Sequence, residues 1–490
     1  MHLNHHHQRS DLVRLATLAM SERGLQPEFA PQVDAQLAAI TGPGRDQDAD
    51  IRDLTGLLWC SIDNDDSLDL DQLTASELLG EGSVRIWVAI ADVDALVKKG
   101  SPIDDHARTN TTSVYTSARI FPMLPERLST DLTSLNFNQD RLALVTEMVF
   151  DAQATLSQST VYRARVRNKA KLAYDAVSAW IDGVGALPSE AANVPGMASQ
   201  LRTQDALAQG LRALRRAQGS LEFETFQPRA VFEGEQVIDI RQQVQNRARQ
   251  LIEEFMIATN GCTARFLAEH GGASLRRVVR SPERWQRIVE VAQEYGETLP
   301  NAPDSKALEA FLAKRHKVDP LRFPDLSLVI VKLMGSGEYV VEASAALPVG
   351  HFGLAVRDYT HSTAPNRRFP DLITSRLVKA ALHKQPAPYD HAELGDLAQH
   401  CTHQEDAANK VERKMRKSEA ALLLESHVGQ RYDALVTGNT NDGVWVRIFK
   451  PPAEGKLLAG ALGLKIGAAV HVKLISTNVE RGFIDFALVD

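Results

Sequence analysis

The densest group of potentially catalytic side chains lies in residues 61–72, which read SIDNDDSLDLDQ. Carboxylates held so close together repel one another and raise one another's pKa unless a cation neutralises them. Mg²⁺ takes oxygen ligands and keeps open positions for water and for a substrate phosphate. The segment therefore favours a site for a divalent cation. Its five aspartates fall within nine positions: Asp63, Asp65, Asp66, Asp69 and Asp71.

Two simpler interpretations compete with a metal site. The acidic segment, taken alone, can also be a solvated loop. A calcium loop of the EF-hand kind is excluded, because that motif needs glycine at its sixth position and glutamate at its twelfth, where this segment has Leu68 and Thr74. Ile62, Leu68 and Leu70 alternate with the acids, and this favours a partly buried strand over an exposed loop.

Two stretches farther along the chain carry aromatic and basic side chains suited to phosphates. In residues 111–125, Tyr115 precedes a rigid Pro-Met-Leu-Pro turn. Residues 162–174 end in Tyr174 and carry basic residues with a period of two, so one face of an extended strand could follow a series of phosphates. The basic side chains of this stretch are Arg163, Arg165, Arg167, Lys169 and Lys171.

Two later stretches add carboxylates and guanidinium groups. Glu253 and Glu254 are adjacent in a largely apolar predicted helix, which indicates that at least one of them meets a cation or a polar site. Arg367 and Arg368 precede a helix that Pro370 can open, and paired arginines suit bidentate phosphate contacts. A single arginine pair is more often a surface ion pair, so this signal depends on the others.

The elements that must position these residues fall into three parts. Residues 1–45 predict a small helical unit, either helix-turn-helix-like or a plain helical hairpin that packs on the main body. Residues 46–425 mix strand and helix patterns and predict an α/β domain. Residues 426–490 contain short alternating segments punctuated by glycine, which are typical of a small β-barrel of the OB-fold type. The predicted fold class is therefore α+β with several domains.

One strand of the predicted barrel presents aromatic and basic side chains on the same face. Trp445, Arg447 and Phe449 alternate with apolar residues. Such a face can stack nucleobases beside a cation. Alternatively, one of these aromatic side chains completes the packing on the outside of the barrel.

Composition and charge set limits on these interpretations. Hydrophobic residues make up 44% and charged residues 24%, as in globular proteins, and the formal net charge is −7. This acidity argues against coating nucleic acid by bulk charge. However, residues 46–71 hold nine aspartates and one arginine, a sum of −8, so the rest of the chain sums to +1. Basic runs at 163–171, 276–287 and 410–417 thus remain available to a polyanion.

The chain has no apolar run of about 18 residues, so no membrane-spanning helix is expected. Residues 1–10 are polar, unlike a secretory signal. Cys60, Cys262 and Cys401 lie far apart and form no C-x-x-C pair, so neither a disulfide framework nor a thiolate zinc site is expected. These features fit a cytoplasmic protein.

Taken together, these stretches resemble the ribonuclease II/R superfamily, whose shared unit is the RNB catalytic domain. The resemblance covers roughly residues 50–425, and the tail resembles an S1-type RNA-binding OB fold. The family's acidic signature looks like T-I-D, five residues, then D-x-D-D. Asp63, Asp69 and Asp71 match its first three aspartates, and Gln72 stands at the fourth. The later blocks that carry the resemblance are IADVDALV, FPMLPERLS, KAKLAYDAVSAW, LIEEFMIATN and YTHSTAPNRRFPDL.

The resemblance implies processive 3′→5′ hydrolysis of single-stranded RNA to nucleoside 5′-monophosphates. It implies one or two Mg²⁺ ions, which Mn²⁺ could replace, held by Asp63, Asp69, Asp71 and the residue at the fourth position. Gln72 offers a metal only an amide oxygen, so we expect weaker Mg²⁺ binding rather than inactivity, with Asp65 or Asp66 as a substitute ligand.

The resemblance also implies roles for other side chains. Arg367 would bind the phosphate under attack. Tyr174 and Glu254, or alternatively Glu253, would position the last nucleotide. Tyr115 would stack on a base near the 3′ end. The residues expected to bind substrate are Tyr115, Glu412, Arg165, Arg167, Arg368 and Trp445.

Two other functions remain open. One is a catalytically silent RNA-binding regulator of the same fold, because Gln72 breaks the signature. The other is a Mg²⁺-dependent phosphoesterase for nucleotides or DNA, which would not need the barrel. We expect single-stranded RNA as the partner, no membrane, no obligate protein partner and a monomer. Relatives commonly carry two cold-shock-type OB folds ahead of the catalytic domain, so RNA capture here is expected to rely on the barrel and the helical unit.

Overall fold

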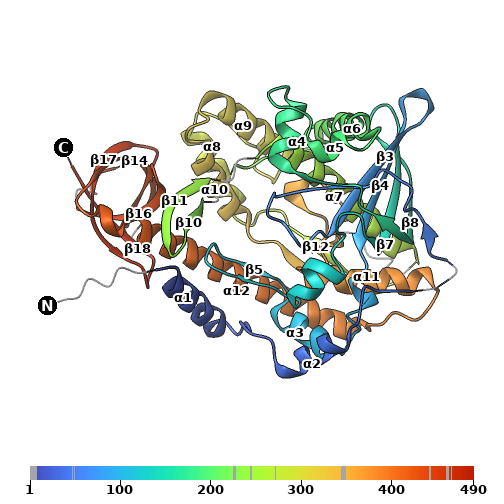
Figure 1. Ribbon diagram of the computed structural model, residues 1–490. Coiled ribbons are helices and arrows are strands. Elements are labelled where there is room, and N and C mark those ends of the chain that lie inside the picture. Colours follow the sequence, from blue (N-terminus) through green and yellow to red (C-terminus); the bar gives the residue numbers. More distant parts are fainter. Residues whose placement is uncertain are drawn as a thin grey trace.

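The computed structural model describes residues 8–46, 48, 50–224, 228–242, 245–270, 272–343, 349–440, 443–459, 463–464 and 466–489. A β-barrel lies at one end of the molecule and a large sheet at the other, and the long helix α12 (His391–Leu424) runs between them (Figure 1). Among the described helices, none is both long and apolar enough to cross a bilayer.

A seven-stranded sheet forms the centre of the main body. In spatial order its strands are β1 (Arg52–Asp53), β8 (Leu156–Arg167), β7 (Asp140–Phe150), β4 (Val84–Ala91), β3 (Gln72–Leu78), β2 (Cys60–Asp63) and β9 (Ala170–Ala173). The pairs β1–β8 and β2–β9 are parallel, and the other pairs are antiparallel. Because β2 ends at Asp63 and β3 begins at Gln72, the acidic segment connects two neighbouring strands.

The prediction of a partly buried strand in the acidic segment is wrong, because residues 64–71 form a loop. Backbone groups of this loop form hydrogen bonds that do not belong to the strand pairing of the sheet. The Leu70 N–H donates to Ser134 Oγ at 3.0 Å, and the Asp71 carbonyl accepts from the Ala91 N–H at 3.0 Å. Leu70 is buried and Leu68 is exposed, so the apolar residues of the segment anchor it at one point only.

Helices cover both faces of the sheet, and β4, which is apolar except for Arg85, packs against both layers. Ile86, Val88 and Ile90 pack in one core cluster, while Trp87 and Ala89 pack in another on the opposite face. The first face is covered by α4 (Tyr174–Ile181), α5 (Ser189–Ala192), α6 (Met197–Ala217) and α7 (Arg247–His270). The second is covered by α3 (Pro102–Asn110), α11 (Phe369–Leu382) and the first half of α12.

Smaller elements surround this body. A helical layer contains α8 (Trp285–Glu294), α9 (Ser305–Val318) and α10 (Phe323–Met334). Three two-stranded sheets pair β5 (Val114–Tyr115) with β6 (Ile120–Phe121), β10 (Pro228–Glu233) with β11 (Gln236–Gln242), and β12 (Ser274–Val278) with β13 (Glu338–Glu342).

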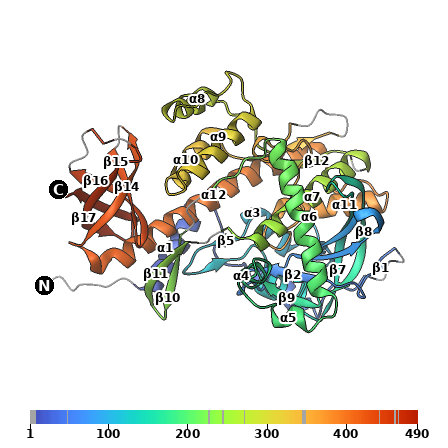
Figure 2. The same cartoon turned by 90° about the horizontal axis from the view of Figure 1, so that it is seen from above.

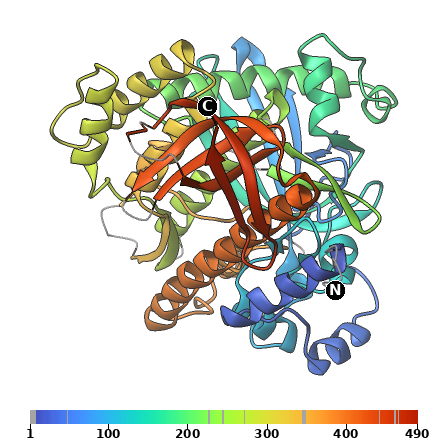
Figure 3. The same ribbon diagram turned by 90° about the vertical axis from the view of Figure 1, so that its left-hand side faces the viewer.

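The N-terminal helices α1 (Arg9–Glu22) and α2 (Pro31–Ala39) dock separately on the body. α1 lies alongside α12 (Figures 1 and 3), and α2 packs on α3. Of the two alternatives predicted for residues 1–45, this arrangement agrees with packing on the main body. Each helix buries its apolar side against the body rather than against the other helix. The buried residues of α1 are Leu12, Leu15, Ala16, Ala19 and Met20.

The C-terminal barrel was predicted correctly. It closes in the order β14 (Arg431–Thr440), β15 (Gly443–Phe449), β16 (Pro452–Ala459), β18 (Phe483–Leu488) and β17 (Ala469–Asn478). Its apolar interior is continuous with the end of α12 and with α1. The barrel is therefore fixed to the main body through a shared core.

Arg447 does not join Trp445 on an exposed face as expected. Its side chain is buried against α10, where Nη2 lies 2.9 Å from Asp325 Oδ2. Burial raises the pKa of Asp325 to about 6 even though Arg447 acts in the opposite direction. The cost of removing these charges from water thus exceeds their attraction, and the pair links the barrel to the helical layer.

We expect Asp325→Ala to lower the melting temperature by a few degrees, because truncation leaves the Arg447 guanidinium buried without its carboxylate, at a cost of about 3 kcal/mol. Combining Asp325→Leu with Arg447→Met should restore the melting temperature, since both buried charges are then removed. Glu77→Ala, which breaks the more exposed pair with Arg85, is the control and should change it little. Equal effects of Asp325→Ala and Glu77→Ala would contradict this account.

Candidate active site

A polar cavity of about 310 Å³ lies where four distant segments of the chain meet: the β2–β3 loop, the start of α4, α7, and the loop before α11. Strands β5 and β10 contribute one residue each to its wall. Its lining residues are Asp63, Asn64, Ser67, Asp69, Gln72, Tyr115, Tyr174, Arg229, Arg249, Ile252, Met256, Thr363 and Arg367. The structure thus brings together most of the residues that the sequence selected as a catalytic group.

Asp71 lies just behind the wall of this cavity and is only 2% exposed. Its Oδ1 accepts the Asn366 N–H at 2.9 Å, and its Oδ2 accepts Arg367 Nε at 3.3 Å. Burial raises the pKa of Asp71 to about 7, Arg367 opposes this shift, and Asp69 adds to it. Arg367 therefore offsets only part of the cost of burying this carboxylate.

Asp63 and Asp69 reach the cavity itself. Asp63 Oδ1 accepts the Asn64 N–H at 2.7 Å and the Ser67 hydroxyl at 2.9 Å. Asp69 Oδ2 accepts the Tyr115 hydroxyl at 3.2 Å, and burial raises the pKa of Asp69. Each carboxylate is thus oriented through one of its oxygens by neighbours on the protein.

Gln72 also lines the cavity, as the fourth position of the acidic signature should. Asp65 and Asp66 are exposed on the loop and do not line it. Asp65 and Asp66 are therefore badly placed to replace Gln72 as ligands of an ion in this cavity.

The cavity also holds tyrosines and arginines from several elements. The Arg249 guanidinium lies 4.4 Å from the centroid of the Tyr174 ring, and its Nη2 donates to Asn64 Oδ1 at 2.7 Å. Burial raises the pKa of both Tyr115 and Tyr174, so each hydroxyl is neutral near pH 7 and can donate a hydrogen bond. Arg249 thus joins the acidic loop to the start of α4.

Helix α12 holds the segment that carries Tyr115. The Tyr115 N–H donates to Glu412 Oε1 at 2.9 Å. Seven residues farther along α12, Glu419 accepts both the N–H and the hydroxyl of Ser117, at 3.1 and 2.9 Å. Glu412 therefore contacts the backbone of this segment and does not line the cavity.

Neither of the adjacent glutamates of α7 lines the cavity. Glu254 is buried in a bidentate ion pair with Arg215 of α6, at 2.5 and 2.8 Å. Glu253 is more exposed and accepts Gln245 Nε2 at 3.2 Å. The face of α7 that meets the cavity carries Arg249, Ile252 and Met256 instead.

The other expected substrate-binding residues also lie outside the cavity. Arg165 and Arg167 are on β8, which β7, β4 and β3 separate from β2, and Arg167 pairs with Asp140 at 2.6 Å. Arg368 pairs with Asp371 at 2.7 Å. Trp445 is on the barrel, where Lys456 Nζ lies 5.9 Å from its ring centroid.

Sequence reasoning missed Asn64, Arg229, Arg249 and Glu419. Asn64 lies within the acidic segment but has no charge to mark it, and no spacing rule connects Arg229 or Arg249 to the aspartates. Glu419 did carry a signal, since it stands beside the apolar run AALLL and a carboxylate in such a place is often buried.

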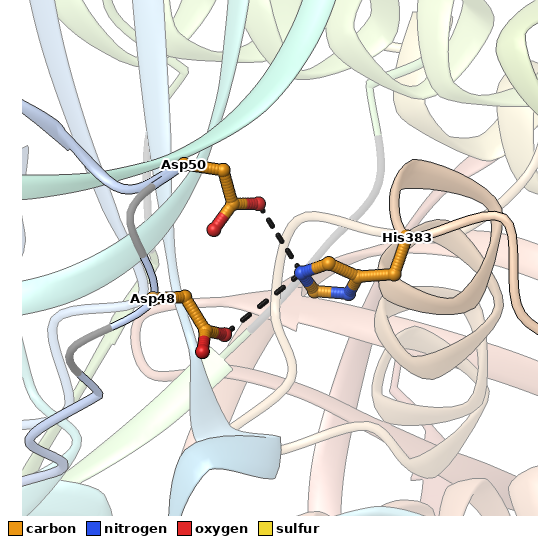
Figure 4. A group of neighbouring side chains, drawn as sticks. All are labelled: Asp48, Asp50 and His383. Atoms are coloured by element: carbon orange, nitrogen blue, oxygen red, sulfur yellow. Dashed lines mark ion pairs between the residues drawn. The ribbon is translucent and has the colours of Figure 1, made fainter.

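Another group of metal-binding residue types lies away from the cavity. Asp48, Asp50 and His383 form the only group of three carboxylate or imidazole ligands within 4.8 Å of one another in the part of the chain described (Figure 4). His383 Nε2 lies 3.2 Å from Asp50 and 3.9 Å from Asp48, while Asp48 also accepts Arg163 Nη1 at 2.7 Å. These ion pairs attach the linker before β1 to the edge of the body. This structural role explains why the three side chains lie close together.

The donors around the cavity fit a divalent cation. Asp63 and Asp69 offer carboxylate oxygens, Gln72 offers an amide oxygen, and hard oxygen donors are the ligands that Mg²⁺ prefers. The raised pKa values of Asp69 and Asp71 point the same way, because a cation would replace the missing positive charge.

Comparison with known families identifies this arrangement. Residues 51–384 match the RNB domain, and residues 430–489 match the C-terminal S1 domain of RNase II-type exonucleases. The chain belongs to the RNB family. The match includes every residue that lines the cavity, and the S1 match coincides with the closed barrel.

Individual relatives agree with this membership. Ribonuclease R 1 of Lactococcus lactis is 30% identical over 459 residues, which cover 87% of this chain and 55% of the relative. The chain thus spans about half the length of this relative. RNase R of Mycoplasma genitalium, solved with ribose-methylated single-stranded RNA, has the same fold, with a TM-score of 0.88 at 23% identity over 98% of this chain and 78% of that one. A yeast pseudonuclease also shares it, with a TM-score of 0.71 at 17% identity over 91% and 55%.

The buried carboxylates predict that divalent cations bind more weakly as the pH falls. An ion that uses Asp71 must displace its proton, so affinity is full above pH 7 and declines below it, by about tenfold for each pH unit. Calorimetric titration with Mg²⁺ between pH 6 and 8 measures this dependence. Asp66→Asn, on the exposed part of the loop, should leave it unchanged, and an affinity constant over this range would contradict the prediction.

Proposed function

We propose that this protein is a divalent-cation-dependent exoribonuclease, which degrades single-stranded RNA processively from its 3′ end and releases nucleoside 5′-monophosphates. The observation that carries the proposal is the contact between Arg367 and Asp71 beside a cavity lined by Asp63 and Asp69. This contact combines a phosphate-binding group with oxygen donors for a cation, as phosphodiester hydrolysis requires. The RNB and S1 matches support the same substrate class.

Asp63, Asp69 and Asp71 would hold Mg²⁺, with Gln72 as a weaker oxygen donor. When bound, the ion supplies a nucleophilic water near neutral pH and neutralises charge on the phosphate. Arg367, half-exposed at the cavity wall, donates from its guanidinium to the non-bridging oxygens of the phosphate under attack. Its ion pair with Asp71 fixes its direction before the substrate arrives.

The tyrosines contribute through their neutral hydroxyls and their rings. Tyr115 donates to Asp69 and presents its ring at the cavity, where a base near the 3′ end can stack on it. Tyr174 stands opposite Arg249 and positions the last nucleotide. Glu412 holds the backbone of Tyr115, so we assign it a positioning role. We assign Glu254 to the attachment of α6 to α7 through Arg215.

The RNA upstream of the cavity would contact the barrel. Trp445 and Lys456 are neighbours on β15 and β16, and a ring beside an ammonium group suits a stacked base and its phosphate. Arg165, Arg167 and Arg368 are engaged or distant in this structure, so we give them no part in the hydrolytic step.

The alternative function is an RNA-binding regulator that does not cleave. Gln72 in the cavity favours it, because this side chain removes one charged donor. The yeast pseudonuclease with the same fold shows that the fold alone does not decide activity.

We expect Gln72→Asp to tighten Mg²⁺ binding about tenfold, equivalent to about 1.4 kcal/mol, because the cavity gains a charged oxygen donor. Calorimetry and the Mg²⁺ dependence of hydrolysis should both shift to lower concentrations. Gln153→Asp makes the same charge change on an exposed turn and should shift neither. No difference between the two variants would contradict a metal-binding role for this position.

An assay with 5′-labelled RNA and DNA distinguishes the functions. With Mg²⁺ we expect progressive 3′ shortening of RNA but not DNA, and none with a chelator. Asp71→Asn should reduce the rate by about 10² or more while RNA binding persists, because it removes a charged group at the reacting centre. Binding without shortening by the wild-type protein would support the regulator, and equal attack on DNA would support a general phosphoesterase.

A further inference from the structure

Three arginines line the cavity, and they differ in what they contact. Arg367 is held by Asp71, and Arg249 donates to Asn64. In the described part of the chain, Arg229 makes no hydrogen bond and no ion pair within 4 Å, although it lines the same cavity. Its guanidinium is therefore available to a ligand.

Arg229 comes from the β10–β11 hairpin, whose backbone is held on both sides. The N–H of the next residue, Ala230, donates to Ser117 Oγ at 3.2 Å, and this hydroxyl in turn donates to Glu419. At the other end of the hairpin, the Arg9 guanidinium lies 5.0 Å from the Phe232 ring centroid. Figure 2 shows the hairpin beside α1 and α12, where its contacts place it. The backbone at Arg229 is thus fixed, while its side chain remains exposed.

The surroundings of Arg229 do not explain it as a structural residue. The positive charge of Arg229 lowers the pKa values of Glu412 and Glu419, but it is the weakest of the influences that lower them. Both carboxylates already accept hydrogen bonds from the Tyr115 segment. An exposed guanidinium in a concave polar site, with five donors and no bound acceptor, suits an oxyanion.

We propose that Arg229 is a substrate-binding residue that contacts the RNA phosphate adjacent to the one bound by Arg367. This inference rests on the proposed function, since it concerns the same substrate in the same cavity. The two guanidinium groups reach one cavity from different elements, the hairpin and the loop before α11, so they can contact successive phosphates of a single strand. The hairpin then acts as a recognition element as well as a wall.

The test measures single-stranded RNA binding against salt concentration in the Asp71→Asn background, where cleavage is suppressed. Each phosphate contact adds about 0.7 to the slope of log K against log salt for a single strand. We expect Arg229→Gln to weaken binding about fivefold to tenfold and to reduce this slope by about 0.7. Arg229→Lys should retain most of the slope, because it keeps the charge. In the cleaving enzyme, Arg229→Gln should raise KM with little change in kcat.

Arg241 provides a matched control on the same hairpin. It is the register partner of Arg229 on β11, is 73% exposed, pairs with Asp239 at 3.2 Å and does not line the cavity. Arg241→Gln makes the same change in net charge and should leave the slope and KM unchanged.

The outcomes separate this inference from the function on which it rests. An unchanged slope and KM in Arg229→Gln, with normal RNA hydrolysis, would overturn the role of Arg229 and leave the exoribonuclease intact. Equal losses in Arg229→Gln and Arg241→Gln would also overturn it, because they would reflect general charge. If the wild-type protein did not hydrolyse RNA at all, the proposed function itself would fail.

Discussion

The contact between Asp71 and Arg367 organises the centre of this molecule. A carboxylate that is 2% exposed would normally be protonated or paired, because an unpaired buried charge is costly. Here one guanidinium and one backbone N–H approach it from the loop before α11. The same two contacts join the start of β3 to the loop that carries Arg367. Packing and chemistry therefore depend on one charge that the protein only partly neutralises.

Helix α12 extends this organisation across the molecule. Its first half packs under the sheet, and its second half holds the Tyr115 segment through Glu412 and Glu419 before entering the shared core with the barrel. The β10–β11 hairpin also lies on it. One long helix thus sets the positions of a cavity wall, a hairpin and the C-terminal barrel relative to one another.

The sequence was most informative where a local pattern decides the structure. Short alternating segments punctuated by glycine predicted the closed barrel. The acidic spacing selected side chains that do meet at one cavity. These features depend on neighbours in the sequence, so they can be read without a model of the whole chain.

The features that the sequence did not reveal depend on contacts between residues far apart in the chain. The sequence predicts a cation or polar site beside Glu254, and the cation in the structure is Arg215, on a different helix. Arg447 followed the strand alternation, yet Asp325 of the helical layer draws it inward. Nothing in the sequence around Arg229 connects it to Asp69, because the hairpin reaches the cavity only after docking on α12.

The distance along the chain between Asp71 and Arg367, 296 residues, has a consequence for synthesis. Chains emerge from the ribosome N-terminal end first, and domains fold as their residues become available. The acidic loop and its sheet are complete long before the loop that carries Arg367 has been translated. The acidic loop consequently stays without Arg367 until the chain has been extended by 296 residues beyond Asp71, while the growing chain is tethered beside its own messenger RNA.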